Sequence, residues 1–136
     1  MLIELQSHST VSDGQLAPAQ VVEEAAKAGV STLALSDHDA IAGVAEAAEA
    51  AERLGVELVP AIEMSCVHEY AEDLHVCGYW IDLGKIAPAC ERAQHERVTR
   101  AGAIVEKLRS HGFDLHLEDA VREAVHQGLL MKGGGH

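Results

Sequence analysis

Histidines and carboxylates in the first 82 residues are the side chains of this sequence that could carry chemistry. Five of them stand out in separate stretches: His8, Asp13, His38, Glu63 and His75. Neutral imidazole and carboxylate oxygens are good ligands for zinc, manganese and iron, and a glutamate can bridge two ions. Two neighbouring cations can hold a hydroxide for attack and clamp the oxygens of a phosphoryl group. These residue types therefore point to a metal centre for phosphoester hydrolysis, although the same ligands also serve amide hydrolysis.

Short apolar runs precede or contain these side chains. The runs predict strands at residues 1–5, 30–35, 56–62 and 73–81, the first of them buried on both faces. Apolar residues at helical spacing predict helices from Pro18 to a stop at Gly29 and over residues 41–54, 86–110 and 117–125, the third with a break near Pro88. Such alternation implies a parallel sheet with right-handed crossovers, and functional groups then gather at the carboxyl ends of the strands. Each of the five side chains follows or closes a predicted strand.

Charge and cysteine content narrow the class of protein. The net charge is -12, and residues 1–84 hold 15 acidic but only 2 basic side chains. This distribution argues against an extended nucleic-acid surface and permits a multi-metal pocket, although a solvated acidic surface explains most of the charge equally well. There is no long apolar span or leader pattern, and the three cysteines form no CxxC pair. We therefore expect a cytoplasmic protein without a membrane segment, and none of its cysteines as a nucleophile.

Four sequence runs carry a resemblance to a known family. They are IELQSHSTVSDG, LALSDHDAIAG, VPAIEMS and DLHVCGYWID. In order and spacing, over residues 2–82, they resemble the successive motifs of the PHP (polymerase and histidinol phosphatase) domain of metal-dependent phosphoesterases. The resemblance implies an α/β fold, a distorted seven-stranded (β/α) barrel of which this chain holds about the first four strands. It also implies two or three divalent ions (Mn, Zn or Fe) and hydrolysis of small phosphomonoesters or nucleotide ends by metal-bound hydroxide.

The resemblance also assigns roles to single residues. His8, Asp13, His38, Glu63 and His75 fall on the family's metal-ligand positions. Glu63 takes the bridging role and, with His38 and Asp37, the catalytic one, whereas Asp37 and Asp39 flank a ligand and could orient it. The helix with Glu96, Arg97 and Arg100 resembles the arginine-bearing helix of small family members. Arg97 and Arg100 could contact a substrate phosphate, or they could simply be a solvated helix face.

The chain departs from the family pattern in two places. Gln6 stands where the first motif usually has a histidine, which makes it a doubtful ligand and would favour harder ions such as manganese. Nothing after residue 82 clearly supplies the later histidine and Asp-x-His pair. Surface positions are expected for His95, His111, His116 and His126, and His136 could mimic the later histidine.

These departures bear on the domain organisation and on partners. We expect a single domain over 1–136, truncated on its carboxyl-terminal side, with a metal-motif region (1–82), a helical region (85–126) and a mobile tail (127–136). Half a barrel leaves sheet edges uncovered, so the isolated chain should self-associate or be unstable. The partners expected are a small phosphorylated substrate or nucleotide. Two alternatives remain open: a non-catalytic metal-binding remnant and an amidohydrolase-like hydrolase.

Overall fold

The structure, a computed structural model, describes residues 1–126, without the side chains of residues 71–73, 120 and 123–126. The predicted mobile tail at 127–136, with His136, lies outside the described residues, as does the side chain of His126. The strands are β1 (Leu2–Ser7), β2 (Val30–Leu35), β3 (Glu57–His68) and β4 (Ala71–Tyr79). The helices are α1 (Pro18–Lys27), α2 (Val44–Leu54), α3 (Leu83–Ser110) and α4 (Leu117–His126).

Local sequence signals explain where the helices begin and end. Pro18 opens α1, where its missing N–H costs no helical hydrogen bond. Gly55 closes α2 in the left-handed conformation, with φ of 68°. The Asp82 side chain accepts hydrogen bonds from the backbone N–H groups of Gly84 and Lys85 and so caps the start of α3.

The predicted break near Pro88 is absent, because α3 runs without interruption through this residue. A proline so near the start of a helix removes one backbone hydrogen bond and leaves the long remainder of the helix intact.

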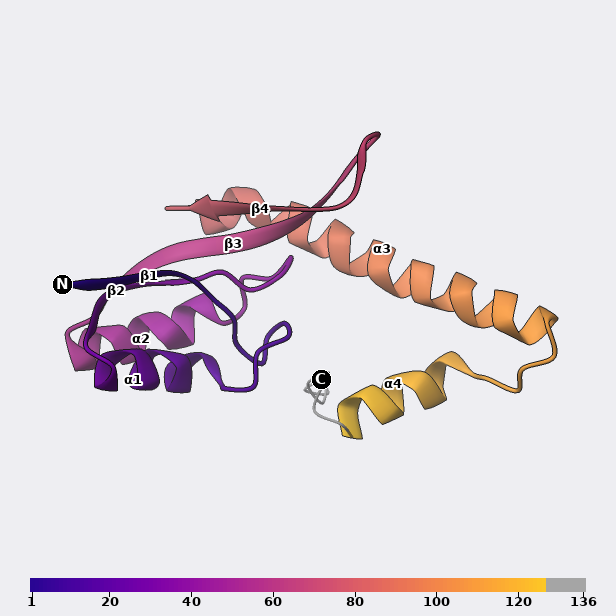
Figure 1. The fold of residues 1–136 in the computed structure, drawn as a ribbon, viewed down its shortest axis with the longest axis horizontal. Helices are drawn as coiled ribbons and strands as arrows, with labels where there is room; N and C mark the ends of the chain where they lie inside the picture. The colour runs from indigo at the N-terminus through magenta and orange to yellow at the C-terminus, as the bar shows by residue number, and fades with distance from the viewer. Residues whose placement is uncertain (127–136) are drawn as a thin grey trace.

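The four strands form one mixed sheet in the order β1-β2-β3-β4 (Figure 1). β1 pairs with β2 and β2 with β3 in parallel, as predicted, but β3 and β4 are antiparallel. The prediction of a purely parallel sheet is therefore wrong for the last pair. Only Glu69 and Tyr70 separate β3 from β4, and a connection this short can join only antiparallel strands.

The prediction that the first strand is buried on both faces is also wrong. β1 lies at one edge of the sheet, and its side chains Leu2 and Ile3 are each 52% exposed. The side chains of a strand are buried only where other elements cover the faces of the sheet, and α1 and α2 contact mainly β2 and β3. Self-association through this edge stays a prediction, which sedimentation of the isolated chain would test.

Two layers of small apolar side chains hold the sheet. α1 and α2 lie side by side against one face of the parallel strands (Figure 1), and their alanines allow close packing. The core between these two helices and the sheet contains Val22, Leu33, Leu35, Ala47, Ala50, Ala51 and Val56. The other face carries a smaller cluster of Ala34, Val59 and Ala61, against which Tyr79 packs.

α3 is only loosely covered by the rest of the described chain. α3 begins after β4 and extends away from the sheet. α4 then runs back in the direction of the sheet (Figure 1). Cys90 is its one buried residue among those described, whereas Val98 is 63% and Ile104 50% exposed. Within residues 1–126, no helix has both the length and the apolar content needed to cross a bilayer.

Candidate metal centre

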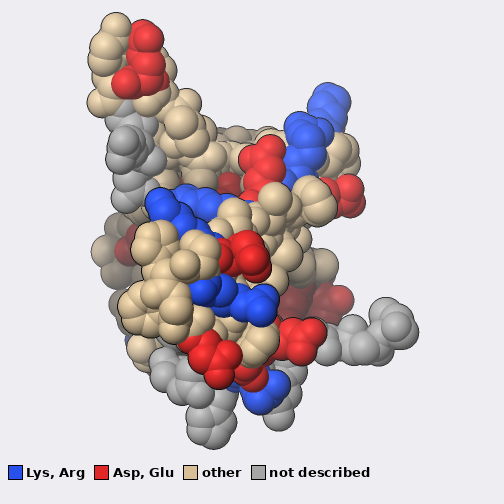
Figure 2. Space-filling model, turned by 90° about the vertical axis from the view of Figure 1, so that its right-hand side faces the viewer, with Lys and Arg blue, Asp and Glu red and all other residues tan. Residues whose placement is uncertain are grey.

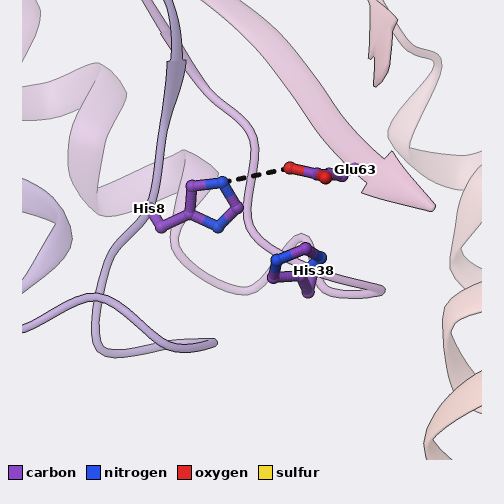
Figure 3. A group of neighbouring side chains, drawn as sticks. All are labelled: His8, His38 and Glu63. Atoms are coloured by element: carbon purple, nitrogen blue, oxygen red, sulfur yellow. Dashed lines mark ion pairs between the residues drawn. The ribbon is translucent and has the colours of Figure 1, made fainter. Parts of the chain in front are cut away.

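The fold brings all five predicted ligands to one edge of the sheet. His8 and Asp13 lie on the loop after β1, His38 on the loop after β2, Glu63 in the second half of β3, and His75 in β4. His8, His38 and Glu63 approach one another from three separate segments of chain (Figure 3). One ligand atom from each of these three residues can be chosen so that all lie within 4.8 Å of one another.

Asp13 and His75 extend this group on either side. Asp13 Oδ1 lies 3.0 Å from His8 Nδ1, and its Oδ2 lies 3.6 Å from His38 Nε2. His75 Nδ1 lies 3.0 Å from Glu63 Oε1, and its ring centroid is 4.8 Å from that of His38. The five side chains thus form one continuous cluster of nitrogen and oxygen donors.

His75 reaches the cluster because β4 is antiparallel. The predicted fourth strand, residues 73–81, contains His75 near its start, and the structure has His75 within β4, opposite Ser65. The expectation that each of the five side chains follows or closes a strand is therefore wrong for His75. The first half of an antiparallel β4 runs beside the last half of β3, so His75 is a diagonal neighbour of Glu63, whose direct partner is Cys77. A parallel fourth strand would have carried His75 to the opposite end of the sheet.

Asp37 ties the first two loops together. Its Oδ1 accepts hydrogen bonds from Ser9 N and Ser12 Oγ, and its Oδ2 accepts one from Ser9 Oγ, each at 2.7 Å. The side chain is buried, with only 2% of Asp37 exposed. With both oxygens occupied in this way, Asp37 orients the loop that carries His8, and this geometry favours an orienting role over direct contact with substrate.

Gly14 lets the same loop fold tightly. A Cβ at Gly14 would lie 2.3 Å from the carbonyl oxygen of His8 and 2.5 Å from its carbonyl carbon. Since these are backbone atoms, they cannot move aside without moving His8 itself. In the Asp13-Gly14 pair of the first motif, a predicted ligand is therefore followed by a position that requires glycine for steric reasons.

Asp39 fixes the second loop against β3 and α3. Its backbone N–H donates to the Glu63 carbonyl at 3.0 Å, and its Oδ1 accepts a hydrogen bond from Ser65 N at 2.8 Å. Its Oδ2 forms an ion pair with Arg97, and its carbonyl accepts a hydrogen bond from Gln94 at 3.3 Å. Asp39 also has a positive φ of 49°, a strained conformation for a non-glycine residue that these contacts hold in place.

Arg97 is therefore not on a purely solvated face, since its guanidinium contacts Asp39 beside the candidate metal centre, although 62% of the side chain is exposed. Arg100 is exposed on the same helix. His95, His111 and His116 are exposed and belong to no metal-ligating group among the described residues.

The Glu63 carboxyl receives hydrogen bonds on both oxygens. Gln6 Nε2 donates to Oε2 at 2.9 Å, and His8 Nε2 lies 3.1 Å from the same oxygen. Burial acts to raise the pKa of Glu63, but the Gln6 hydrogen bond, the charges of His38 and His8, and the His75 contact together hold it below its usual value. Glu63 is therefore ionised and able to bind a cation.

The cluster fits a divalent metal by its donors and by one unsatisfied atom. His38 Nδ1 is buried and has no hydrogen-bond partner within the described residues. Three imidazoles also lie close together, since the ring centroid of His38 is 4.6 Å from that of His8 and 4.8 Å from that of His75. This arrangement of nitrogen and carboxylate donors is what zinc, manganese and iron bind.

Four residues that hold the site together were not predicted from the sequence. Ser9 and Ser12 bind Asp37, and Ser65 and Gln94 bind Asp39. Two serines inside the Gly-terminated first motif are a signal that could have indicated loop hydrogen bonds. The partners of Asp39 are far along the chain and leave no local pattern.

Comparisons with known proteins agree with this geometry. The family model of the PHP domain matches residues 4–127. The phosphoribosyl 1,2-cyclic phosphate 1,2-diphosphodiesterase of Eggerthella lenta is 35% identical over 124 residues, which is 89% of this chain and 47% of that protein. The 3',5'-nucleoside bisphosphate phosphatase of Chromobacterium violaceum is 34% identical over 122 residues, 88% of this chain and 42% of that protein.

A solved structure from Bifidobacterium adolescentis, named as a candidate metal-dependent phosphoesterase, superimposes with a TM-score of 0.76. The two chains are 29% identical, and the match covers 97% of this chain but 44% of the Bifidobacterium chain. The chain therefore spans less than half the length of these relatives. Because the family model covers nearly all of the sequence and the motifs converge on one cluster, the chain belongs to the PHP domain family.

Proposed function

We propose that the chain forms the metal-binding part of a divalent-metal-dependent phosphoesterase that acts on small phosphomonoesters or nucleotide ends. The observation that carries this proposal is the convergence of His8, His38 and Glu63 from three separate segments, with donor atoms within 4.8 Å of one another. Both curated relatives described above carry names of enzymes that cleave phosphate esters. Ions bound here would polarise the phosphoryl group and activate water for attack.

The side chains divide into those that hold the ions and those that hold the ligands. His8, Asp13, His38, Glu63 and His75 would bind two or three ions of Mn, Zn or Fe. Glu63 is the candidate for bridging, since its two oxygens contact His8 and His75 and its side chain is buried, whereas Asp13, which also lies near two histidines, is largely exposed. Asp37 and Asp39 would keep the two loops in place and do not need to touch substrate.

Arginines on α3, the helix after β4, can neutralise the negative charge of a substrate phosphate. Residues 1–84 contain 2 basic side chains, Lys27 and Arg53, and both lie in the last turns of α1 and α2, away from the carboxyl edge of the sheet. Arg97 already contacts Asp39 at the site, and Arg100 follows one helical turn later. These two arginines are therefore the candidates for binding a substrate phosphate, in addition to the ions.

The rest of the visible α3 and α4 surface has no single sign of charge. Lysine and arginine side chains alternate there with aspartate and glutamate (Figure 2). A long nucleic-acid strand binds best to a continuous basic groove, so the mixed surface supports a small phosphorylated substrate or the end of a short one.

A second candidate function is metal binding without turnover. It is favoured by the exposure of His95, His111 and His116, which leaves the described donors confined to β1 through β4 and their loops. In this case the ion would stabilise the fold, and no phosphate would be released.

Metal binding and phosphate release should be measured on the same sample. We expect manganese or zinc to bind the purified chain, to raise its melting temperature, and to support phosphate release from nucleoside monophosphates or bisphosphates. His38→Ala and Glu63→Ala should abolish release, whereas the matched surface changes His95→Ala and Glu49→Ala should not. Binding without release favours the second function, and a folded chain that binds neither ion contradicts both.

A further inference from the structure

Gln6 makes a contact with Glu63 that its position in the sequence does not predict. It lies near the end of β1, and its side-chain nitrogen Nε2 is 2.9 Å from Glu63 Oε2, although the two residues are 57 positions apart. The backbone N–H of Gln6 is itself fixed by a hydrogen bond of 3.0 Å to Glu4 Oε1. Gln6 is an exposed residue of the edge strand whose amide contacts the candidate metal centre.

The chemistry of the two groups fixes the direction of this bond. An ionised carboxylate can only accept hydrogen bonds, and an amide nitrogen can only donate them. The nitrogen of Gln6 must then face Glu63, and it has no lone pair to offer an ion. To bind an ion, Gln6 would have to turn its amide around and give up the bond to Glu63.

The contacts of Glu63 with the histidines differ in kind from its contact with Gln6. His8 Nε2 and His75 Nδ1 lie 3.1 and 3.0 Å from its two oxygens. An imidazole nitrogen that binds an ion has lost its proton and can no longer donate to a carboxylate. The bond from Gln6 is the one of these three contacts that an ion does not compete for.

We propose that Gln6 is a positioning residue that holds the Glu63 carboxylate ready for the metal and does not itself bind the ion. This inference rests on the metal centre proposed above. It predicts that removal of the Gln6 amide weakens metal binding without reducing the number of ions bound. Loss of a hydrogen bond to a metal-binding carboxylate typically costs about 10-fold to 100-fold in metal affinity.

The test is calorimetric titration of manganese and of zinc into the wild-type chain, Gln6→Ala and Gln6→Met, with bound metal counted by elemental analysis. Gln6→Met keeps the length of the side chain and removes only the polar group, so it remains informative if Gln6→Ala fails to fold. Gln15→Ala, an exposed glutamine of the first loop, is the control. Melting temperatures in chelator separate a loss of stability from a loss of affinity.

The proposal expects the dissociation constant to rise by about 10-fold or more in both variants, with an unchanged number of ions per chain and an unchanged affinity in Gln15→Ala. Fewer ions per chain in the Gln6 variants would make Gln6 a ligand and overturn the proposal. An unchanged affinity, with or without a lower melting temperature, would overturn it as well. If the folded wild-type chain binds no ion, the proposed function fails and this inference fails with it.

Discussion

Replacement of Asp37 by alanine should separate the scaffold of the centre from its ligands. The Asp37 carboxylate accepts three hydrogen bonds of 2.7 Å, two from Ser9 and one from Ser12. Hydrogen bonds to a charged group contribute about 1.5–3 kcal/mol each. Ser9 is 0% exposed, so its two donors cannot turn to water, whereas the half-buried Ser12 can. Counting only the two bonds from Ser9, we expect a loss of about 3–6 kcal/mol in the free energy of unfolding.

Such a loss would consume much of the stability of a domain of this size, which is about 5–15 kcal/mol. The assay is urea unfolding of the metal-free chain, followed by circular dichroism. Asp82→Ala, which removes the exposed cap of α3, is the control and should cost about 1 kcal/mol. A change below about 1 kcal/mol in Asp37→Ala would refute the argument. Loss of phosphate release at unchanged stability would instead assign Asp37 a direct catalytic role.

Three further changes test other contacts of the centre. Gly14→Ala should destabilise the chain by about 1–3 kcal/mol or more and weaken metal binding, since its Cβ would meet the His8 backbone at 2.3 Å; wild-type metal affinity would contradict this. Arg97→Ala should lower the free energy of unfolding by about 1–3 kcal/mol, because it leaves the buried Asp39 carboxylate without its cation. The expected value is reduced because 62% of the Arg97 side chain is exposed. Amide hydrogen exchange in α3 should then become faster. In metal-free protein, the lowered pKa of Glu63 means that its contribution to stability is complete above pH 4.5 and disappears as the pH falls through the folded-state value. Unfolding measured across that range should show wild type and Glu63→Gln converging towards low pH, and a constant difference would speak against it.

The sequence was sufficient to predict which side chains meet, because that prediction needs only the ends of the strands. Apolar runs ending in His8, His38 and Glu63 predict three parallel strands whose carboxyl ends share an edge, and in the structure these side chains meet. Glu63 nevertheless lies within β3, which continues to His68. The direction of the fourth strand was not predictable in the same way. Alternation of apolar and polar residues reports which face is buried, and it is the same for a strand read in either direction.

Neither the exposure of β1 nor the ion pair between Arg97 and Asp39 could be predicted from the sequence. The apolar residues of β1 read as buried, yet Leu2 is 52% exposed because burial depends on what lies next to the strand. The pairing of Arg97 with Asp39 spans 58 positions and depends on the direction in which α3 leaves β4. An arginine on a solvated helix face and one that reaches a buried carboxylate have the same local sequence pattern.

The β3–β4 hairpin explains how one edge of the sheet can gather so many predicted ligands from a short stretch of chain. In a parallel sheet each strand offers the edge only its last residues, and a helical crossover must separate each strand from the next. The antiparallel return of β4 offers His75 without a crossover, diagonally beside Glu63. One oxygen of Glu63 therefore contacts His75 of its own hairpin, and the other contacts His8 of the loop after β1. A carboxylate in that position contacts two segments that are far apart in the sequence, so its loss should affect metal binding more than the loss of any single histidine.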